Sequence, residues 1–198
     1  MKTWKLGLIG SAVATMLVAS TGVAFSQSRL VHGDEPSRGP ESAAVNLVVF
    51  CDFECPLCAS MAPVLDQLVA VHPSDLRLVY RHFPVQRIHP DATRAAEAAS
   101  CAQDQGRFWD MYASMLSHQD ALDEGGLVQQ AGDMGLDWRT FARCLDNGQH
   151  DTDWHRDLAD GHAVGVTGTP TFFVNGKFIE GTRTFDQLDA YVRAALRR

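Results

Sequence analysis

The chain of 198 residues lacks several patterns that would point directly to a function. It has no glycine-rich loop of the nucleotide-binding kind, no internal repeat and no low-complexity tract. None of its eight histidines is followed by another four residues later, which is the spacing of zinc metalloproteases. These absences argue against nucleotide-dependent enzymes, repeat architectures and that class of protease.

Basic residues are also few. The chain has 17 Lys and Arg against 24 Asp and Glu, a formal net charge of −7. Without residues 1–26, which contain two of the lysines and no acid, 15 basic residues face 24 acidic ones and the net charge is −9. Such a surface is poorly suited to phosphate backbones, so we expect no nucleic-acid partner. A hydrophobic content of 45% is sufficient for a globular core.

Residues 1–26 have the pattern of an export signal. Lys2 and Lys5 precede an apolar run over 6–23, and Ala24 and Ser26 are small residues before a cleavage point. Polar and glycine interruptions make the run a poor permanent membrane span, although an uncleaved anchor is the alternative. We therefore predict a signal peptide and a periplasmic or otherwise extracytoplasmic protein. Thiols can stay oxidised there, which makes disulfide chemistry the first interpretation of the five cysteines.

The next part of the chain predicts a strand, a helix and a second strand. After an irregular lead-in (27–43), the β-branched and aromatic run 45–50 indicates a buried strand. A helical pattern follows over 56–71 and a strand pattern over 76–83. Two strands joined by one helix form a βαβ unit, which is normally parallel and right-handed.

The remainder of the chain is helical and then returns to strands. Strands are expected at 171–174 and 177–179, joined by a hairpin turn at Asn175-Gly176. The spacing of Thr184 and Gln187 fits a capping box at the start of a closing amphipathic helix. The helical patterns before these strands cover 90–105, 108–116, 126–134, 138–147 and 152–162.

Cys55-Pro56-Leu57-Cys58 stands where the first strand gives way to a helix. Pro56 suits the first helical position, so Cys55 falls at the helix start, where unpaired N–H groups stabilise a thiolate. This predicts a pKa of Cys55 lowered toward neutrality or below. Cys58, almost one turn later, is placed to form a disulfide with Cys55 and release a substrate thiol. A structural disulfide, or a metal site with two further ligands, is the alternative for a bare Cys-x-x-Cys pair.

Three segments together resemble one family: DFECPLC at 52–58, QGRFW at 105–109 and GVTGTPTFFVNG at 165–176. The chain is similar to exported thiol-disulfide oxidoreductases of the DsbA-like branch of the thioredoxin superfamily. The resemblance implies an α/β thioredoxin fold with an inserted helical domain. Residues 44–86 and 165–198 would form the thioredoxin-like domain and residues 87–164 the insertion, in agreement with the order of elements predicted above.

The resemblance also implies roles for individual residues. Cys55 would attack substrate, Cys58 would resolve the mixed disulfide, and Pro170 would be a cis-proline that, with Thr169, shapes a groove for an added peptide strand. The pattern alone marks Thr169-Pro170 only as a turn or strand start. No organic cofactor is expected. The implied partners are unfolded or cysteine-containing exported proteins and a membrane redox protein.

Two positions depart from the family pattern. Val49 stands where many relatives have a buried acid, which removes a proton relay through that side chain. Leu57 stands where the strongly oxidising members have a histidine, so one cationic stabiliser of the thiolate is missing. We therefore expect a milder oxidant than those relatives.

The other cysteines allow further interpretations. Cys101 and Cys144 lie on predicted helices, and we expect a structural disulfide between them; two buried free thiols are the alternative. Cys51 is then unpaired and is interpreted as a small buried residue. The alternative is a regulatory thiol or a third Cu(I) ligand with Cys55 and Cys58.

Three functions remain open at this level: a dithiol oxidase, a reductase or isomerase of the same fold, and a copper or zinc chaperone using Cys51, Cys55 and Cys58.

Other polar residues near the motif are not expected to take part in the chemistry. His82 and His89 flank the end of the second strand and are expected at the surface or at caps. Glu54 is expected to be an exposed turn carboxylate.

Overall fold

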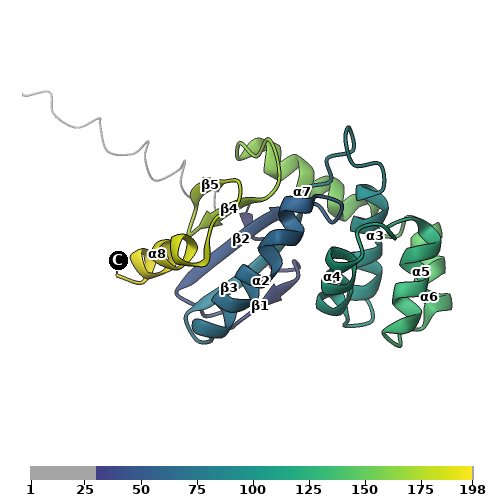
Figure 1. Ribbon diagram of the computed structural model, residues 1–198, viewed down its shortest axis with the longest axis horizontal. Coiled ribbons are helices and arrows are strands. Elements are labelled where there is room, and N and C mark those ends of the chain that lie inside the picture. The colour runs from purple at the N-terminus through teal and green to yellow at the C-terminus, as the bar shows by residue number, and fades with distance from the viewer. Residues whose placement is uncertain (1–29, 198) are drawn as a thin grey trace, which may run out of the picture.

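The computed structural model describes residues 30–197, so the predicted signal peptide at 1–26 lies outside the described part of the chain. A five-stranded sheet has the order β1-β3-β2-β4-β5 (Figure 1). β2 and β3 are parallel and joined by α2, which confirms the βαβ unit, while β4 runs antiparallel to β2 and β5 antiparallel to β4. The bounds are Val45–Cys51 for β2, Pro56–Val71 for α2, Leu76–His82 for β3, Thr171–Val174 for β4 and Lys177–Glu180 for β5.

A short strand in the lead-in was not expected. β1 (Ser37–Arg38) pairs antiparallel with β3 through Val79 and Leu78. Two residues between a proline and a glycine carry no strand periodicity, and their pairing depends on residues about 40 positions later in the sequence. Local pattern could therefore not predict β1.

Five helices are inserted between β3 and β4, as expected for an α/β fold with a helical insertion. Figure 1 shows α3 to α6 grouped at one side of the sheet, whereas α7 returns toward it and contacts β3. No helix within residues 30–197 is both long and apolar enough to cross a membrane. The bounds are Ala92–Gln103 for α3, Phe108–Ser117 for α4, Glu124–Asp133 for α5, Trp138–Asp146 for α6 and Asp151–Ala163 for α7.

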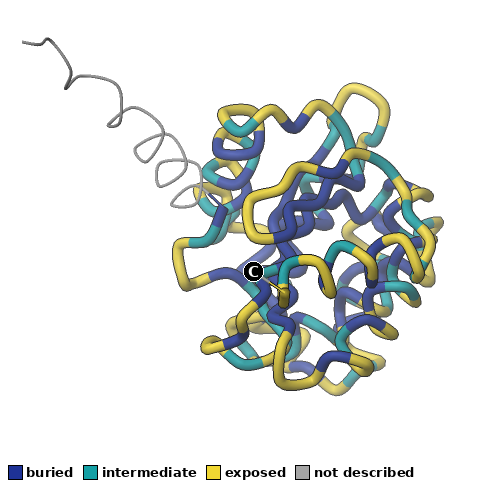
Figure 2. Tube along the Cα trace, turned by 90° about the vertical axis from the view of Figure 1, so that its left-hand side faces the viewer, coloured by how far each residue is buried: buried dark blue, intermediate teal, exposed yellow. Residues whose placement is uncertain are grey.

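Both faces of the sheet are covered. α2 and α8 (Phe185–Leu196) pack on one face and α7 on the other, so the strands lie in the buried middle of the molecule (Figure 2). β2 alternates between two clusters of apolar side chains: Val49 and Cys51 belong to the larger one on the α2 side, and Val48 and Phe50 to the smaller one opposite. This double burial explains the continuous apolar run that predicted the strand.

Two local signals at the C-terminal end are confirmed. Asn175 and Gly176 both have positive φ, 44° and 83°, in the turn between β4 and β5. Thr184 and Gln187 form the reciprocal capping box at the start of α8, because each side chain accepts a hydrogen bond from the backbone N–H of the other. These short-range interactions fix the elements that follow Pro170.

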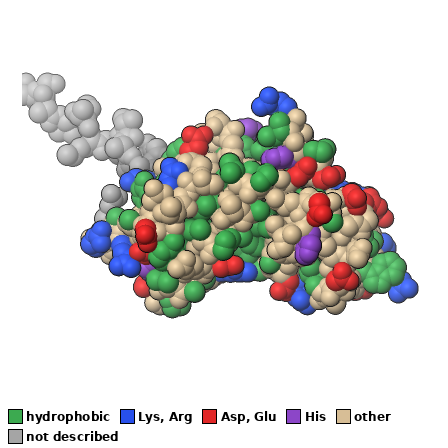
Figure 3. Space-filling view, viewed as in Figure 1, with side chains coloured by type: hydrophobic (Ala, Val, Ile, Leu, Met, Phe, Trp, Pro, Cys, Tyr) green, Lys and Arg blue, Asp and Glu red, His purple; other side chains and the backbone are tan. Residues whose placement is uncertain are grey.

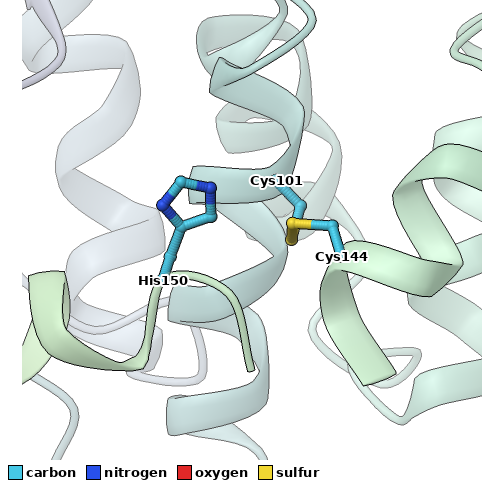
Figure 4. A group of neighbouring side chains, drawn as sticks. All are labelled: Cys101, Cys144 and His150. Carbon is cyan, nitrogen blue, oxygen red and sulfur yellow. A yellow bond between two sulfur atoms is a disulfide. The ribbon is translucent and has the colours of Figure 1, made fainter. Parts of the chain in front are cut away.

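A disulfide joins the helices of the insertion. Cys101 of α3 and Cys144 of α6 are bonded at an S–S distance of 2.02 Å, with Cα atoms 5.9 Å apart. Figure 4 shows His150 beside this bond. A bridge between residues 43 positions apart restricts the unfolded chain and stabilises the fold by about 4 kcal/mol in the chain-entropy estimate.

A buried arginine connects the start of the described chain to α7. Arg81 is fully buried on the α7 side of the sheet and donates hydrogen bonds to Asp157 at 2.8 Å and Asp160 at 2.9 Å. It also donates to the carbonyl of Leu30 at 2.9 Å. Because a buried cation needs compensating charge, these acids fix α7 against β3.

His82 lies in the core, so the expectation of a surface or capping role is wrong. Its ring is only 3% exposed and contacts the rings of Phe53, Tyr80 and Phe108. The strand places it there because alternate residues of β3 face α2. Burial, followed by the charge of Arg81, lowers the pKa of His82 to about 3.

This pKa predicts acid sensitivity. His82 is neutral in the folded protein but protonates near pH 6.5 when unfolded, so its contribution to stability is complete above pH 6.5 and is lost as the pH falls toward 3. Between pH 7 and 4.5 we expect His82 to account for roughly 2–3 kcal/mol of lost unfolding free energy. Urea denaturation of wild type and His82→Asn at both pH values measures this. Equal losses in the two proteins would contradict the assignment.

Candidate active site

The two cysteines of the motif occupy the start of α2. Cys55 is the N-cap residue, Pro56 follows at the first helical position, and the backbone N–H groups of Cys58 and Ala59 donate to the Cys55 carbonyl. Cys55 is 5% exposed and Cys58 1%. Cys58 lies behind Cys55, and its sulfur accepts the N–H of Asp52 at 3.4 Å. The outer sulfur is therefore the one that a substrate reaches first.

Thr169 and Pro170 lie opposite this pair although they are more than a hundred residues away in sequence. The Thr169-Pro170 peptide bond is cis. The Thr169 carbonyl accepts a hydrogen bond from the Cys55 thiol at 3.6 Å, and the Pro170 carbonyl accepts the N–H of Gly181. The site thus brings the end of β2, the start of α2 and the turn before β4 together.

The surroundings of Cys55 oppose its ionisation. The hydrogen bond with the Cys58 side chain, followed by burial, raises the pKa of the Cys55 thiol above its ordinary value. The contacts with Thr169 and with the Cys58 N–H act in the opposite direction but are weaker. Burial also raises the pKa of Cys58. The lowered pKa expected from the helix start alone is therefore wrong for this dithiol, because two buried sulfurs compete with the backbone donors.

A groove lies beside the Cys55-Cys58 motif. It has a volume of about 320 Å³ and is open to solvent. Leu57, 53% exposed, stands at one end of it, and Figure 3 shows hydrophobic side chains across the middle of the face that carries α2. The lining residues of the groove are Leu57, Ser60, Met61 and Val64 from α2 and residues 182–184 and 187.

Comparison with known proteins agrees with this geometry. A family model described as Thioredoxin matches residues 32–194. The chain belongs to the thioredoxin family. This confirms the thioredoxin family and the fold that the resemblance implied, with helices inserted between β3 and β4.

Two solved structures resemble this thioredoxin-family chain throughout. A thioredoxin-like oxidoreductase from Silicibacter pomeroyi is 26% identical, with a TM-score of 0.79, covering 87% of this chain and 98% of that one. The thiol-disulfide exchange protein α-DsbA2 from Wolbachia pipientis is 19% identical, also with a TM-score of 0.79, covering 89% and 95%. The similarity to α-DsbA2 supports the fold of this chain and carries no statement about its activity.

The curated relatives are longer proteins. A protein from Salinispora tropica named Na(+)/H(+) antiporter NhaA 3 is 34% identical over 201 residues, covering 98% of this chain but 31% of that protein. The thioredoxin-family chain therefore spans about a third of the length of this relative. The antiporter name describes the longer protein.

Asp52 is a site residue that the sequence pattern did not reveal. Its side chain is fully buried and accepts the N–H groups of Glu54 and Val85, each at 2.8 Å. The Nδ1 of His89 lies 2.7 Å from the same carboxylate, so His89 is a partner of the site and not a surface residue. Since the Asp52 N–H also contacts the Cys58 sulfur, one residue links the redox pair to the loop after β3.

Two further polar residues fasten the turn before α2. Gln119, from the segment after α4, donates to the carbonyls of Phe53 at 2.7 Å and Cys55 at 3.0 Å. Glu54 is half-buried and accepts the N–H of Asp91 at 2.7 Å, so its expected role as an exposed carboxylate is wrong. The sequence signal for both is weak, because their partners lie 37 or more positions away.

Potential metal ligands come together at one place in the described part of the chain. Within residues 30–197, Cys101, Cys144 and His150 form the one group of three potential ligands whose donor atoms all lie within 4.8 Å of one another. Its two sulfurs are already bonded to each other (Figure 4). Cys51, Cys55 and Cys58 belong to the same core cluster but do not form such a group in the described part of the chain.

We expect Asp52 to be far more important than an exposed acid on the same segment. Asp52→Ala leaves two backbone donors and His89 without their buried acceptor, which should lower the unfolding free energy by about 3–5 kcal/mol. Asp52→Asn keeps one acceptor oxygen and should lose less. Asp66→Ala removes only an exposed pair with Arg38 and should change stability by less than about 1 kcal/mol. Urea denaturation compares the three; equal losses for Asp52→Ala and Asp66→Ala would refute the linking role.

Proposed function

We propose that the chain is an exported thiol-disulfide oxidoreductase in which Cys55 and Cys58 form a reversible disulfide and act as a dithiol oxidase. The observation that carries this is the placement of both sulfurs at the start of α2, with the Thr169 carbonyl 3.6 Å from the Cys55 sulfur. Cysteines so placed can exchange disulfides, and the neighbouring backbone can pair with a peptide.

The proposed reaction moves two electrons from substrate to protein. A substrate thiolate attacks the Cys55 sulfur of the Cys55–Cys58 disulfide, a mixed disulfide forms and Cys58 leaves as the reduced thiol. A second substrate thiolate then attacks the substrate sulfur and releases Cys55. The substrate gains a disulfide and the protein becomes the dithiol. A membrane redox partner would take the electrons and restore the disulfide, and this cycle needs no organic cofactor.

The proposed substrates are unfolded or cysteine-containing exported proteins. Main-chain pairing beside Thr169 and Pro170 would accept many sequences, because every residue offers a backbone donor or acceptor. The groove beside Leu57 adds a place for an apolar side chain that only an unfolded chain exposes. Together they favour extended peptides over folded surfaces.

Two observations support export to an extracytoplasmic compartment such as the periplasm. Residues 1–26 have the pattern of a signal peptide. The disulfide between Cys101 and Cys144 is of the kind that persists in oxidising compartments.

A second candidate, a reductase or isomerase using the same cysteines, is favoured by the electrostatics of the site. The contact with Cys58 and burial raise the pKa of Cys55, and Leu57 brings no positive charge. A thiolate that is poorly stabilised makes the disulfide form relatively more stable, which weakens the oxidant and strengthens the reductant. The reduction potential of the Cys55–Cys58 pair separates the two candidates.

Trapping tests the assignment of the two cysteines. Cys58→Ser removes the resolving thiol, so a peptide whose single cysteine carries an activated disulfide should accumulate as a mixed disulfide with Cys55 as the activating thiolate leaves, visible by mass spectrometry. Cys55→Ser, the matched control, should trap at least 100-fold less because both remaining thiols, Cys51 and Cys58, are more deeply buried than Cys55. Equal trapping by both variants would overturn the assignment of Cys55 as the attacking residue.

A substitution at Leu57 tests the prediction that the protein is a milder oxidant than its strongly oxidising relatives. Leu57→His places a cation near the thiolate, which should lower the pKa of Cys55 by about one unit and raise the reduction potential by about 30 mV. Thiolate absorbance and equilibration with glutathione measure the two quantities. Leu57→Asn is the neutral control and should shift neither. A wild-type Cys55 pKa below about 4 would contradict the milder oxidant.

A further inference from the structure

Cys51 gives the redox pair a third sulfur. It closes β2, is 3% exposed and faces α2 together with Val49. The Cys51 thiol lies close enough to Cys58 to contribute to the raised pKa of the Cys58 thiol, after burial, and the next residue, Asp52, donates its N–H to the Cys58 sulfur. Cys58 therefore has one thiol neighbour on its outer side, Cys55, and another on its inner side, Cys51.

The inner side also contains polar groups that packing alone does not explain. The strand register places Tyr80 beside Val49 and His82 beside Cys51, on the face toward α2. Within residues 30–197, neither the Tyr80 hydroxyl nor the His82 Nδ1 has a hydrogen-bond partner, although both are fully buried. Such groups are uncommon in a core, and a redox or catalytic role is one of the explanations for them. The thiol of Cys51 thus has polar as well as apolar residues on its side of the sheet.

We propose that Cys51 is a third redox-active residue, which exchanges with Cys55 for the bond to Cys58. The proposal rests on the proposed function. In the oxidised protein the Cys51 thiolate attacks the Cys58 sulfur, the Cys51–Cys58 bond forms and the Cys55–Cys58 bond breaks. Cys55 leaves as a thiolate and takes up the proton that Cys51 lost. No electrons enter or leave the protein, so no further reactant is required.

The exchange adds an activity to the oxidised protein. With the disulfide between Cys51 and Cys58, Cys55 is free beside Thr169 while the chain remains oxidised. In this form Cys55 can attack a disulfide of a substrate, and the resulting mixed disulfide has no adjacent thiol to resolve it. A long-lived mixed disulfide allows the substrate to rearrange its own bonds. The same chain would then donate disulfides from one isomer and rearrange them from the other.

Peptide mapping of the oxidised wild-type protein tests this. The protein is quenched in acid, its free thiols are alkylated in denaturant, and the chain is cleaved after glutamate. Glu41, Glu54 and Glu97 then separate residues 42–54, with Cys51, from residues 55–97, with Cys55 and Cys58. The expected product is the two peptides linked through Cys51 and Cys58, with Cys55 alkylated.

The other products are informative. A disulfide only within residues 55–97, with Cys51 alkylated, overturns this inference and leaves the proposed function intact. A link through Cys55, with Cys58 alkylated, also overturns it. Alkylation of all three cysteines after treatment with oxidised glutathione would overturn both this inference and the proposed function.

A variant supplies an independent measurement. Cys55→Ser leaves Cys51 and Cys58 as the candidate pair, and oxidation with diamide should remove both free thiols and give the linked peptides. The matched control, Cys51→Ala with Cys55→Ser, has a single thiol at the site and cannot form this bond. Two free thiols in folded Cys55→Ser after diamide treatment would overturn the proposal and agree with Cys51 as a packing residue.

Discussion

The buried carboxylate of Asp52 is the constraint on which the geometry of the redox site depends. Its oxygens gather the N–H groups of Glu54 and Val85 and the ring of His89, while its own N–H contacts the Cys58 sulfur. A carboxylate without exposure to water requires such donors, since an unsatisfied buried charge is strongly destabilising. The end of β2 and the loop after β3 are therefore fixed relative to each other, and α2 begins from this junction.

The same junction sets the electrostatic balance of the site. Backbone donors at the start of α2 favour a thiolate at Cys55, but the neighbouring Cys58 sulfur and burial outweigh them and raise the pKa. Leu57 is exposed beside Cys55 and brings no charge to it. The site therefore stabilises negative charge on Cys55 only weakly, whereas a strong oxidant requires a well-stabilised thiolate.

Much of this architecture could be predicted because its signals are local. The strand that becomes β2, the proline after Cys55, the Asn175-Gly176 turn and the Thr184 capping box are each encoded within a few residues. What could not be predicted depends on partners far away. β1 forms only against β3, and His82 is buried by Phe53 and Phe108.

The roles of Asp52 and Gln119 also depend on partners that are far away in the sequence. Asp52 could be seen in the motif, but nothing nearby in sequence indicates that Val85 and His89 would supply its donors. Gln119 stands 64 positions from the Cys55 carbonyl that it contacts. The expected low pKa at Cys55 failed for the same reason, since the helix start is a local feature and burial is a property of the whole fold.

The hydrogen bond from Arg81 to the Leu30 carbonyl holds Leu30 against the sheet. Leu30 packs in the apolar cluster on the α7 side of the sheet, whereas the groove at Leu57 opens on the α2 side. The segment that begins at Leu30 is therefore fastened to the face of the sheet opposite the groove, and residues 30–44 contribute nothing to the lining of the groove.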